Sequence, residues 1–458
     1  MGILTAPIER ASPSDLVPRA IDTALVPMQV GSVLELAPTA ISGAAVTEAI
    51  DRRTRAIPRL RQRLIDAPVG CGRPLWVDDD DFDIERHVRQ VNCPDPGDEA
   101  ALLAVVADVF SERLPDEHPP WSVTFVAGLS SGGTALVAVF HHVLADGIGG
   151  LAVLAGLVDG AREVALPDGF PRPRPGARAL LVDATEERLR ALRRFPSTVR
   201  SVGQAIGELR RTGTPRIGHS SLNRPTGPER ALAVARVDLA SVVELAHARG
   251  GTVNDVVLTA VAGALRSTLE RRGEHTAAEF VMTLPVTTRR EASTTELGND
   301  IGVKPVAVPA RGGPDHRLAE TARRRARAEP PTEAVTRLLD AVFRLTGRLH
   351  LFGWFANRQR MVHTFVTNLR GPAERLTFLG AEVDELIPVS AISGNVTVAF
   401  AVLSYAGTLT ITVVADPTAC PDLALLKEDL QAELDVLTGR LGRSGTGAPG
   451  QDPGIRGQ

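Results

Sequence analysis

The sequence predicts a mixed α/β protein with two domains, and three observations support this prediction. The chain has 458 residues, which is more than one ordinary hydrophobic core accommodates and suits two domains of roughly 200 residues each. Hydrophobic residues make up 43% of the chain and charged residues 23%, as in globular proteins. Short apolar runs alternate with segments of helical periodicity, which is the pattern of sheets covered by helices.

Composition divides the chain into four parts. The first domain is predicted over residues 1–165 and the second over residues 221–441. Between them, residues 166–220 contain repeated Pro and Gly and then Arg-rich helical segments, which favours an extended crossover connector over a third core. Residues 442–458 are rich in Gly and Pro, and we expect them to form a disordered tail.

Charge and cysteine content exclude several classes of protein. The 51 basic and 54 acidic residues give a net charge of −3, so no strongly basic domain exists and nucleic acid is not an expected partner. Cys71, Cys93 and Cys420 are few and far apart, which fits a reducing compartment and neither a disulfide framework nor a zinc site. The first residues lack the apolar core of a signal peptide, and no apolar run reaches the roughly 18 residues that span a bilayer. We therefore expect a cytoplasmic protein that at most rests on a membrane surface.

The first domain contains three segments with clear local signals. Residues 45–65 predict an amphipathic helix that is interrupted at Pro58, because proline lacks a backbone donor. The acidic run 78–81 matches no metal-binding loop, so we expect a solvated loop there. Residues 122–142 predict a buried hairpin, two apolar runs joined by SSGG, and residues 151–160 predict a short helix after it. The polar residues between that hairpin and that helix lie where α/β folds often place their chemistry.

In the second domain, apolar periodicity resumes at Leu232 and continues to Leu269. A Gly-Gly pair ends one helix, and either Thr252 or Asn254 caps the next. The last helix is predicted over residues 423–441. The predicted strands of this domain cover residues 279–287, 303–309, 363–369, 395–405 and 407–416.

The sharpest functional signal is HHVLADG, residues 141–147, at the end of the second hairpin strand. Adjacent strand residues point to opposite faces, so only one of His141 and His142 can face a site. Imidazole exchanges a proton near neutrality, since its ordinary pKa is about 6.5. Asp146, in a turn closed by Gly147, can fix the local geometry or hold a cation from another segment. A metal site needs converging ligands that this spacing does not offer, so we expect none.

Two other patterns are weaker. Residues 128–132, GLSSG, match the GxSxG pattern in which a nucleophilic Ser lies between a strand and a helix. The residues after Ser130 favour a strand, so we interpret the segment as the turn of the hairpin. His350 and His363 stand alone, which is more typical of hydrogen-bonded core histidines than of catalytic ones.

HHVLADG resembles the HHxxxDG motif of CoA-dependent acyltransferases. Further segments, in the right order along nearly the whole chain, resemble the bacterial wax ester synthase/acyl-CoA:diacylglycerol acyltransferase family. These segments are PMQVG at 27–31, RPLWVDDDDFDIERHVRQ at 73–90, PPW at 119–121, SLNRPTGPER at 221–230, TVNDVVLTAVAGALR at 252–266, LGNDIG at 297–302 and TNLRGP at 367–372. Gln29 and Pro120 depart from the residues usual in this family, His and Leu respectively.

The resemblance implies a pseudo-two-fold pair of chloramphenicol-acetyltransferase-like domains, each a mixed sheet flanked by helices, with an active-site tunnel at their interface. It implies a catalytic motif made of His141, His142, Asp146 and Gly147. His142 would act as general base on an acceptor hydroxyl that attacks the acyl-CoA thioester directly, so that no covalent enzyme intermediate forms. Acyl-CoA would be a co-substrate, with no tightly bound cofactor.

Three further residues are assigned by the same resemblance. Asp146 would orient the motif and pair with an arginine, for which Arg289 is one candidate. Asn254 and Asp255 carry the ND motif of the family, which would support the substrate site from the second domain. A plain role of Asn254 as a helix cap stays open beside that one.

The favoured function is acylation of a lipid alcohol, either diacylglycerol or a long-chain fatty alcohol. The motif sets the chemistry and not the acceptor, so the same reaction on a non-lipid alcohol or amine is an alternative. A second alternative is a lipid-binding or lipid-droplet protein without catalysis. Residues 335–360 combine helically spaced apolar residues with arginines, which predicts either a core-facing helix or contact with a lipid surface. The sequence does not indicate an oligomeric state.

Overall fold

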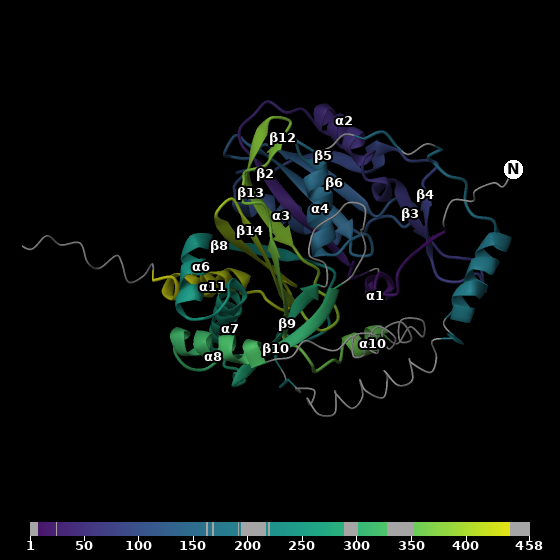
Figure 1. Ribbon diagram of the computed structural model, residues 1–458. Coiled ribbons are helices and arrows are strands. Elements are labelled where there is room, and N and C mark those ends of the chain that lie inside the picture. The colour runs from purple at the N-terminus through teal and green to yellow at the C-terminus, as the bar shows by residue number, and fades with distance from the viewer. Residues whose placement is uncertain are drawn as a thin grey trace, which may run out of the picture.

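The computed structural model describes residues 8–23, 25–161, 164–166, 169–190, 192–193, 217–218, 220–287, 301–327 and 352–439. The described residues form two six-stranded sheets and one smaller three-stranded sheet. Helices flank both large sheets, as Figure 1 shows, so the predicted mixed α/β class is confirmed. The predicted tail 442–458 lies outside the described residues, as does most of the second half of the connector.

The N-terminal sheet, drawn mostly in purple and blue, has the strand order β12-β13-β2-β7-β6-β5. Its strands are β2 (Gln29–Leu36), β5 (Val88–Asn92), β6 (Trp121–Ala127), β7 (Thr134–His141), β12 (Thr377–Phe378) and β13 (Ala381–Val389). Alternate residues of β2 and β7 pack on opposite faces, as the pleat of a strand requires. One face is covered by α2 (Gly43–Thr54) and α4 (Gly147–Leu157), and the other by α3 (Glu99–Ser111).

A smaller sheet lies beside this domain and has the order β1-β4-β3. Its strands are β1 (Glu9–Arg10), β3 (Gln62–Ile65) and β4 (Leu75–Asp78). The short helix α1 (Leu16–Ile21) follows β1, and two 3-10 turns, Pro58–Arg61 and Ile84–Arg86, precede β3 and β5. A helix over residues 177–190 of the connector packs Leu180 against this sheet. The connector therefore returns to the first domain before the second begins.

The C-terminal sheet, drawn in green and yellow, has the order β10-β9-β11-β14-β15-β8. Its strands are β8 (Ala231–Asp238), β9 (Glu279–Thr287), β10 (Ile301–Pro309), β11 (Thr364–Arg370), β14 (Val398–Tyr405) and β15 (Thr408–Ala415). Its helices are α6 (Leu239–Ala248), α7 (Val253–Arg271), α8 (Pro314–Arg327), α10 (Phe352–Ala356) and α11 (Leu423–Leu437). Figure 1 shows α6, α7, α8 and α11 gathered on one side of the sheet. The apolar face of α7 lies at the centre of this core.

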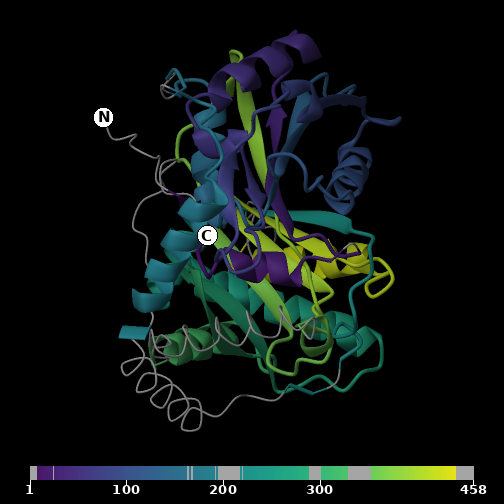
Figure 2. The same cartoon turned by 90° about the vertical axis from the view of Figure 1, so that its right-hand side faces the viewer.

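Two features join the halves of the molecule, which Figure 2 shows one above the other. The inner faces of the two large sheets share one apolar core, in which Val33 and Val137 of the first sheet meet Val234 and Val414 of the second. In addition, β13 crosses from the second half of the sequence to pair antiparallel with β2. The predicted division at residues 165 and 221 stays a prediction, but the sheets do not follow it strictly.

Local predictions succeeded where periodicity was strong. The hairpin is confirmed, because β6 and β7 pair antiparallel through a turn that contains Ser130, with no helix after it. The five strands predicted in the second domain correspond to β9, β10, β11, β14 and β15. The helix predicted over 45–65 is shorter, since α2 ends at Thr54 and the segment after Pro58 turns into β3.

The expectation of a solvated loop at residues 78–81 is wrong for its first two residues. Asp78 is 4% exposed and Asp79 is 5% exposed. Arg172 of the connector binds Asp78 through two guanidinium nitrogens, at 2.8 and 2.9 Å, and Gln62 donates to it at 2.8 Å. Burial raises the pKa of Asp78, but the hydrogen bonds from Arg172 and Gln62 outweigh it and lower that pKa below its ordinary value. The charge is therefore buried because a distant segment pairs with it.

None of the helices in the described ranges is both long enough and apolar enough to cross a bilayer.

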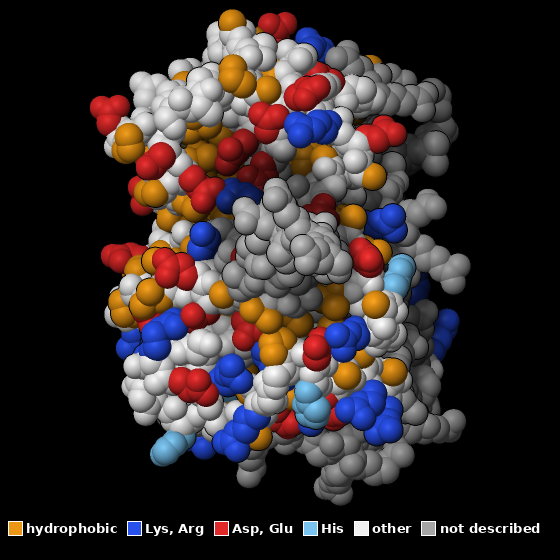
Figure 3. All heavy atoms as spheres, turned by 90° about the vertical axis from the view of Figure 1, so that its left-hand side faces the viewer, with side chains coloured by type: hydrophobic (Ala, Val, Ile, Leu, Met, Phe, Trp, Pro, Cys, Tyr) orange, Lys and Arg blue, Asp and Glu red, His pale blue; other side chains and the backbone are white. Residues whose placement is uncertain are grey.

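The face that lies on the left of Figure 1 carries acidic and basic side chains side by side rather than sorted by sign (Figure 3).

A carboxylate pair lies where the two large sheets meet. Glu35 of β2 stands opposite Glu385 of β13, and Arg236 of β8 donates to Glu385 at 2.7 Å and also binds Glu99 of α3. Burial, and next the charge of Glu385, raises the pKa of Glu35 to about 7, although Arg236 opposes the shift. Glu35 consequently holds a proton in the folded protein at a pH where the unfolded chain has lost it.

We predict that Glu35→Gln weakens the dependence of stability on pH. Between about pH 4.5 and 7 the folded wild type binds more protons than the unfolded chain, so its free energy of unfolding falls as the pH rises through this window. The neutral variant should lose roughly 1–3 kcal/mol less than wild type between pH 5 and pH 8. Urea unfolding at both pH values measures this difference, with Glu382→Gln on the exposed side of β13 as control. Parallel pH profiles for wild type and Glu35→Gln would contradict the assignment.

Candidate active site

His142 directly follows β7, at the C-terminal end of a strand that has neighbours on both sides in the N-terminal sheet. Its backbone N–H donates to the carbonyl of Met28 at 2.8 Å, which fixes the chain where β7 ends. The residue is half-buried, and its Nδ1 atom is buried.

His141, the last residue of β7, has both ring nitrogens engaged. Its Nδ1 accepts a hydrogen bond from the backbone N–H of Val143 at 2.9 Å, and its Nε2 lies 3.5 Å from a carboxylate oxygen of Asp22. Burial raises the pKa of Asp22, but His141, together with the backbone N–H of Met28 and the charge of Arg113, lowers that pKa below its ordinary value. His141 thus ties the turn to the N-terminal segment, and of the two histidines His142 is better situated to meet a substrate.

Asp146 is fully buried and caps α4, because its carboxylate accepts from the backbone N–H of Gly149 at 2.8 Å. This cap starts the helix at Gly147, four residues earlier than predicted, since the prediction rested on apolar periodicity alone. Arg289, the candidate partner of Asp146, lies outside the described residues. The geometry supports a role of Asp146 in holding the turn between β7 and α4.

Gly147 lies against β11 of the second sheet. A Cβ atom at this position would lie 2.9 Å from Cδ2 of Leu369 and 3.0 Å from Cδ1. Glycine therefore lets the turn approach β11 without displacing the end of the Leu369 side chain. The motif HHVLADG and the segment TNLRGP meet at this contact.

The two residues of the ND motif behave differently. Asp255 is fully buried and completes a capping box, in which it accepts from the backbone N–H of Thr252 at 2.7 Å and from Arg325 at 2.8 Å. Thr252 is therefore the cap of α7, which closes the alternative left open for Asn254. Asn254 instead accepts a hydrogen bond from the side-chain amide of Asn368 on β11.

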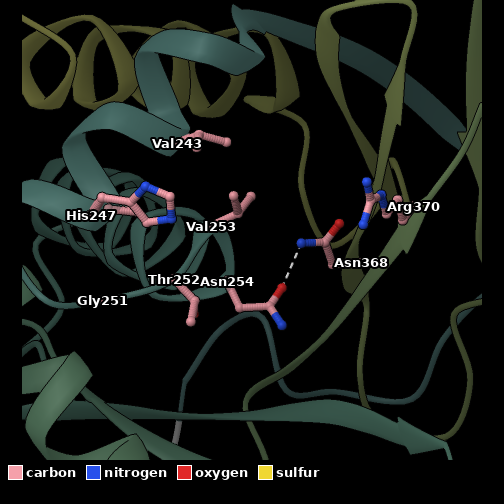
Figure 4. Close-up of a pocket in the computed structure, with 9 residues that line it drawn as sticks. Val243, His247, Gly251, Thr252, Val253, Asn254, Asn368 and Arg370 are labelled. Carbon is pink, nitrogen blue, oxygen red and sulfur yellow. Dashed lines mark hydrogen bonds between the residues drawn. The ribbon is translucent and has the colours of Figure 1, made fainter. Parts of the chain in front are cut away.

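A cavity of about 410 Å³ opens beside this amide pair (Figure 4). It is lined by Val243, Ala246, His247, Gly251, Thr252, Val253, Asn254, Asn368 and Arg370. Side chains alternate along β11, so Asn368 and Arg370 face the cavity while Leu369 faces the turn at Gly147. One face of β11 therefore contacts the turn at Gly147, and its other face lines the cavity beside Asn254.

The ladder between β9 and β11 is short. It contains two residue pairs, Thr364 with Met282 and Phe365 with Thr283, although both strands continue beyond them. The printed pairing of β11 with β9 therefore ends three residues before Asn368.

Sequence reasoning missed His247, Asn368 and Arg370. The last two lie within TNLRGP, so their position in a polar segment after an apolar strand was the available signal. His247 carries no such signal, because it reaches the cavity only through the packing of α6 on α7. Within the described ranges, no three His, Cys, Asp or Glu side chains are arranged to hold a metal ion.

Comparisons with known proteins agree with this geometry. The family model of the wax ester synthase/diacylglycerol acyltransferase catalytic domain matches residues 11–257, and that of the WS/DGAT C-terminal domain matches residues 297–438. A probable diacylglycerol O-acyltransferase of Mycobacterium tuberculosis is 29% identical over 437 residues, which cover 91% of this chain and 93% of the relative. A putative diacylglycerol O-acyltransferase of the same organism is 31% identical over 402 residues, covering 81% and 83% respectively.

Solved structures share the fold. The wax ester synthase/diacylglycerol acyltransferase from Marinobacter aquaeolei has a TM-score of 0.66 at 22% identity and covers 94% of this chain and 100% of its own. The starter condensation domain of rhizomide synthetase in complex with C8-CoA has a TM-score of 0.59 at 14% identity and covers 95% of each chain. The chain belongs to the wax ester synthase/diacylglycerol acyltransferase family, and it is an acyl-CoA-dependent acyltransferase.

We predict that Gly147→Ala disturbs the turn through Leu369. The added methyl group must displace Leu369 or α4, which should lower the free energy of unfolding by about 1–3 kcal/mol and reduce kcat at least tenfold. Leu369→Ala, combined with Gly147→Ala, should restore part of both losses. Gly150→Ala in the same helix is the matched control, because no atom lies within 4 Å of its new Cβ. Thermal unfolding and acyl-transfer rates are measured for each variant. Equal unfolding temperatures and equal rates for Gly147→Ala and Gly150→Ala would contradict the role of Gly147 in this contact.

Proposed function

We propose that this protein transfers a fatty acyl group from acyl-CoA to the hydroxyl of diacylglycerol or of a long-chain fatty alcohol, with His142 as general base. The products are triacylglycerol or a wax ester, and free CoA. The observation that carries this proposal is the half-buried His142 at the turn that Gly147 packs against β11. The names of the relatives, diacylglycerol O-acyltransferases, support the choice of acceptor.

In this mechanism His142 takes the hydroxyl proton while the acceptor oxygen attacks the thioester carbonyl carbon. The C–S bond then breaks, and the proton returns from the imidazolium to the CoA sulfur. Because Nδ1 of His142 is buried, Nε2 is the nitrogen that meets the acceptor. A thioester is already activated, so the reaction needs no Ser or Cys nucleophile. The turn after β7 is held in place by His141, Asp146 and Gly147. On the side of the second domain, Asn254 lines the substrate site and Asp255 fixes the start of α7 beside it.

The choice of acceptor has one alternative. The same chemistry can act on a non-lipid alcohol or amine. Purified protein is incubated with palmitoyl-CoA and a panel of acceptors that includes diacylglycerol, hexadecanol and short polar alcohols and amines. Thiol release and product mass identify the acceptor. Absence of thiol release with every acceptor would refute the proposed function.

We predict that His142→Ala lowers kcat by about 10²–10⁴-fold, the usual contribution of a general base. The side chain is only partly buried, so the variant should fold, and its thermal unfolding should stay near that of wild type. Ser130→Ala is the control, since Ser130 lies in the turn between β6 and β7 and should leave the rate unchanged. A His142→Ala variant that keeps a third of the wild-type rate would exclude the general-base role.

We further propose that the protein works in the cytoplasm at the surface of a membrane or lipid droplet, with contact through residues 335–360. Only residues 352–360 of this segment are described. Within them Trp354 is 62% exposed, and the guanidinium of Arg358 lies 5.3 Å from its ring centroid. An exposed tryptophan beside arginine suits the boundary between water and an anionic lipid surface.

We predict that Trp354→Glu weakens binding to anionic phospholipid vesicles roughly tenfold, because the ring no longer enters the interface. Vesicle co-sedimentation at increasing lipid concentration measures this change. Leu425→Glu on α11 is the matched control, since Leu425 is also exposed, at 44%, on another face. Equal binding of both variants and wild type would reject the proposed surface.

A further inference from the structure

Asp22 directly follows α1, and its carboxylate joins three separate segments of the first domain. The side chain is 5% exposed, so protein donors replace water around it. The backbone N–H of Met28 donates to Oδ1 at 2.9 Å, and Arg113, after α3, donates to Oδ2 at 3.1 Å. Nε2 of His141, the last residue of β7, lies 3.5 Å from the same Oδ2. Two of these three contacts lead to the backbone of His142.

The first contact acts through the ring of His141. Its Nδ1 accepts from the backbone N–H of Val143 at 2.9 Å, so this nitrogen carries no proton. The proton of the ring therefore lies on Nε2, the nitrogen that faces Asp22. A carboxylate accepts at both of its oxygens and favours this tautomer. Asp22 consequently stabilises the form of His141 that can accept from Val143.

The second contact acts through the backbone of Met28. The N–H of Met28 donates to Asp22, and the carbonyl of Met28 accepts from the N–H of His142 at 2.8 Å. These two hydrogen bonds place the start of His142 relative to Asp22. The ring of His141 holds Val143, the residue on the other side of His142. The backbone around His142 is thus tied to one buried carboxylate at two points.

We propose that Asp22 is a positioning residue for acyl transfer, which holds His142 in place through Met28 and through the ring of His141. The inference rests on the proposed function, in which His142 is the general base. Placement matters for that role, because a base must lie within hydrogen-bond reach of the proton that it takes. A displacement of about 1 Å costs about a hundredfold in rate. Asp22 acts through its neighbours and not on the reacting atoms.

The test compares two substitutions that separate the shape of the side chain from its acceptors. Asp22→Asn keeps the shape, but its single amide oxygen cannot accept from both Met28 and His141, so one donor faces the NH2 group. This variant should lower kcat with palmitoyl-CoA about 10- to 100-fold and leave KM within about threefold of wild type. Asp22→Glu should keep at least about a third of the wild-type rate, since it retains two acceptor oxygens and can approach His141 more closely.

Asp116→Asn is the matched control, because Asp116 pairs with the same Arg113 at 3.2 Å but is 76% exposed. It should leave both kcat and KM unchanged. Thermal unfolding is recorded for every variant, and rates are compared at a temperature at which all of them are folded. The proposal is overturned if Asp22→Asn keeps the wild-type kcat, or if Asp22→Asn and Asp22→Glu lose activity equally.

Nitrogen NMR of isotope-labelled protein tests the inference without any assay of activity. The ring signals of His141, assigned by their loss in His141→Gln, should show a neutral ring with its proton on Nε2 near neutral pH. In Asp22→Asn, either these signals or the amide signal of Met28 should move, since one of the two donors loses its acceptor. A cationic or Nδ1-protonated His141 in wild type would refute the inference, as would unchanged signals from both residues in the variant.

The two readouts separate the inference from the proposed function. If wild type shows no acyl transfer while the NMR signals behave as expected, the function is refuted and the contacts of Asp22 stand. If wild type is active, and His142→Ala abolishes transfer while Asp22→Asn does not, the function stands and the positioning role is refuted.

Discussion

The structure depends on the close approach of the turn at Gly147 to Leu369 of β11. The first half of the chain contributes the histidine, and the second half contributes the strand against which that histidine's turn is packed. A Cβ atom at residue 147 would lie about 3 Å from the end of the Leu369 side chain, so glycine lets the turn and β11 pack here without moving that side chain. The shared apolar core between the sheets and the insertion of β13 beside β2 join the same two halves of the chain that meet at this contact.

In both polar dipeptides of the candidate site, His141-His142 and Asn254-Asp255, the two neighbouring residues have different contacts. In the HH pair, His141 contacts Val143 and Asp22, while His142 is half-buried. In the ND pair, Asp255 binds Thr252 and Arg325, while Asn254 lines a cavity. One residue of each pair fixes the backbone at the end of an element, and its neighbour presents a functional group. A catalytic group needs this support, since small displacements at a reacting centre are costly in rate.

Several arginine–carboxylate pairs join helices and strands that are far apart in the sequence. Arg236 of β8 binds Glu385 of β13 and Glu99 of α3, and Arg172 of the connector binds Asp78 of β4. The Asp78 carboxylate is tolerated in the interior because donors from Arg172 and Gln62 replace water around it. Such pairs also specify which segments meet, because an unpaired partner would be left with an uncompensated charge.

Periodicity and turn chemistry in the sequence determined the α/β class, the hairpin of β6 and β7, the strands β9, β10, β11, β14 and β15, and the motif at His142, because these signals are local. Only the tertiary structure decided that β13, whose charged residues obscure its alternation, joins β2, since its partner lies over 340 residues earlier. It also decided that Thr252 caps α7, that Asp255 binds Arg325, and that His247 and Arg370 flank one cavity. These facts depend on which distant surfaces pack together, and packing of that kind leaves no pattern within a single stretch of chain.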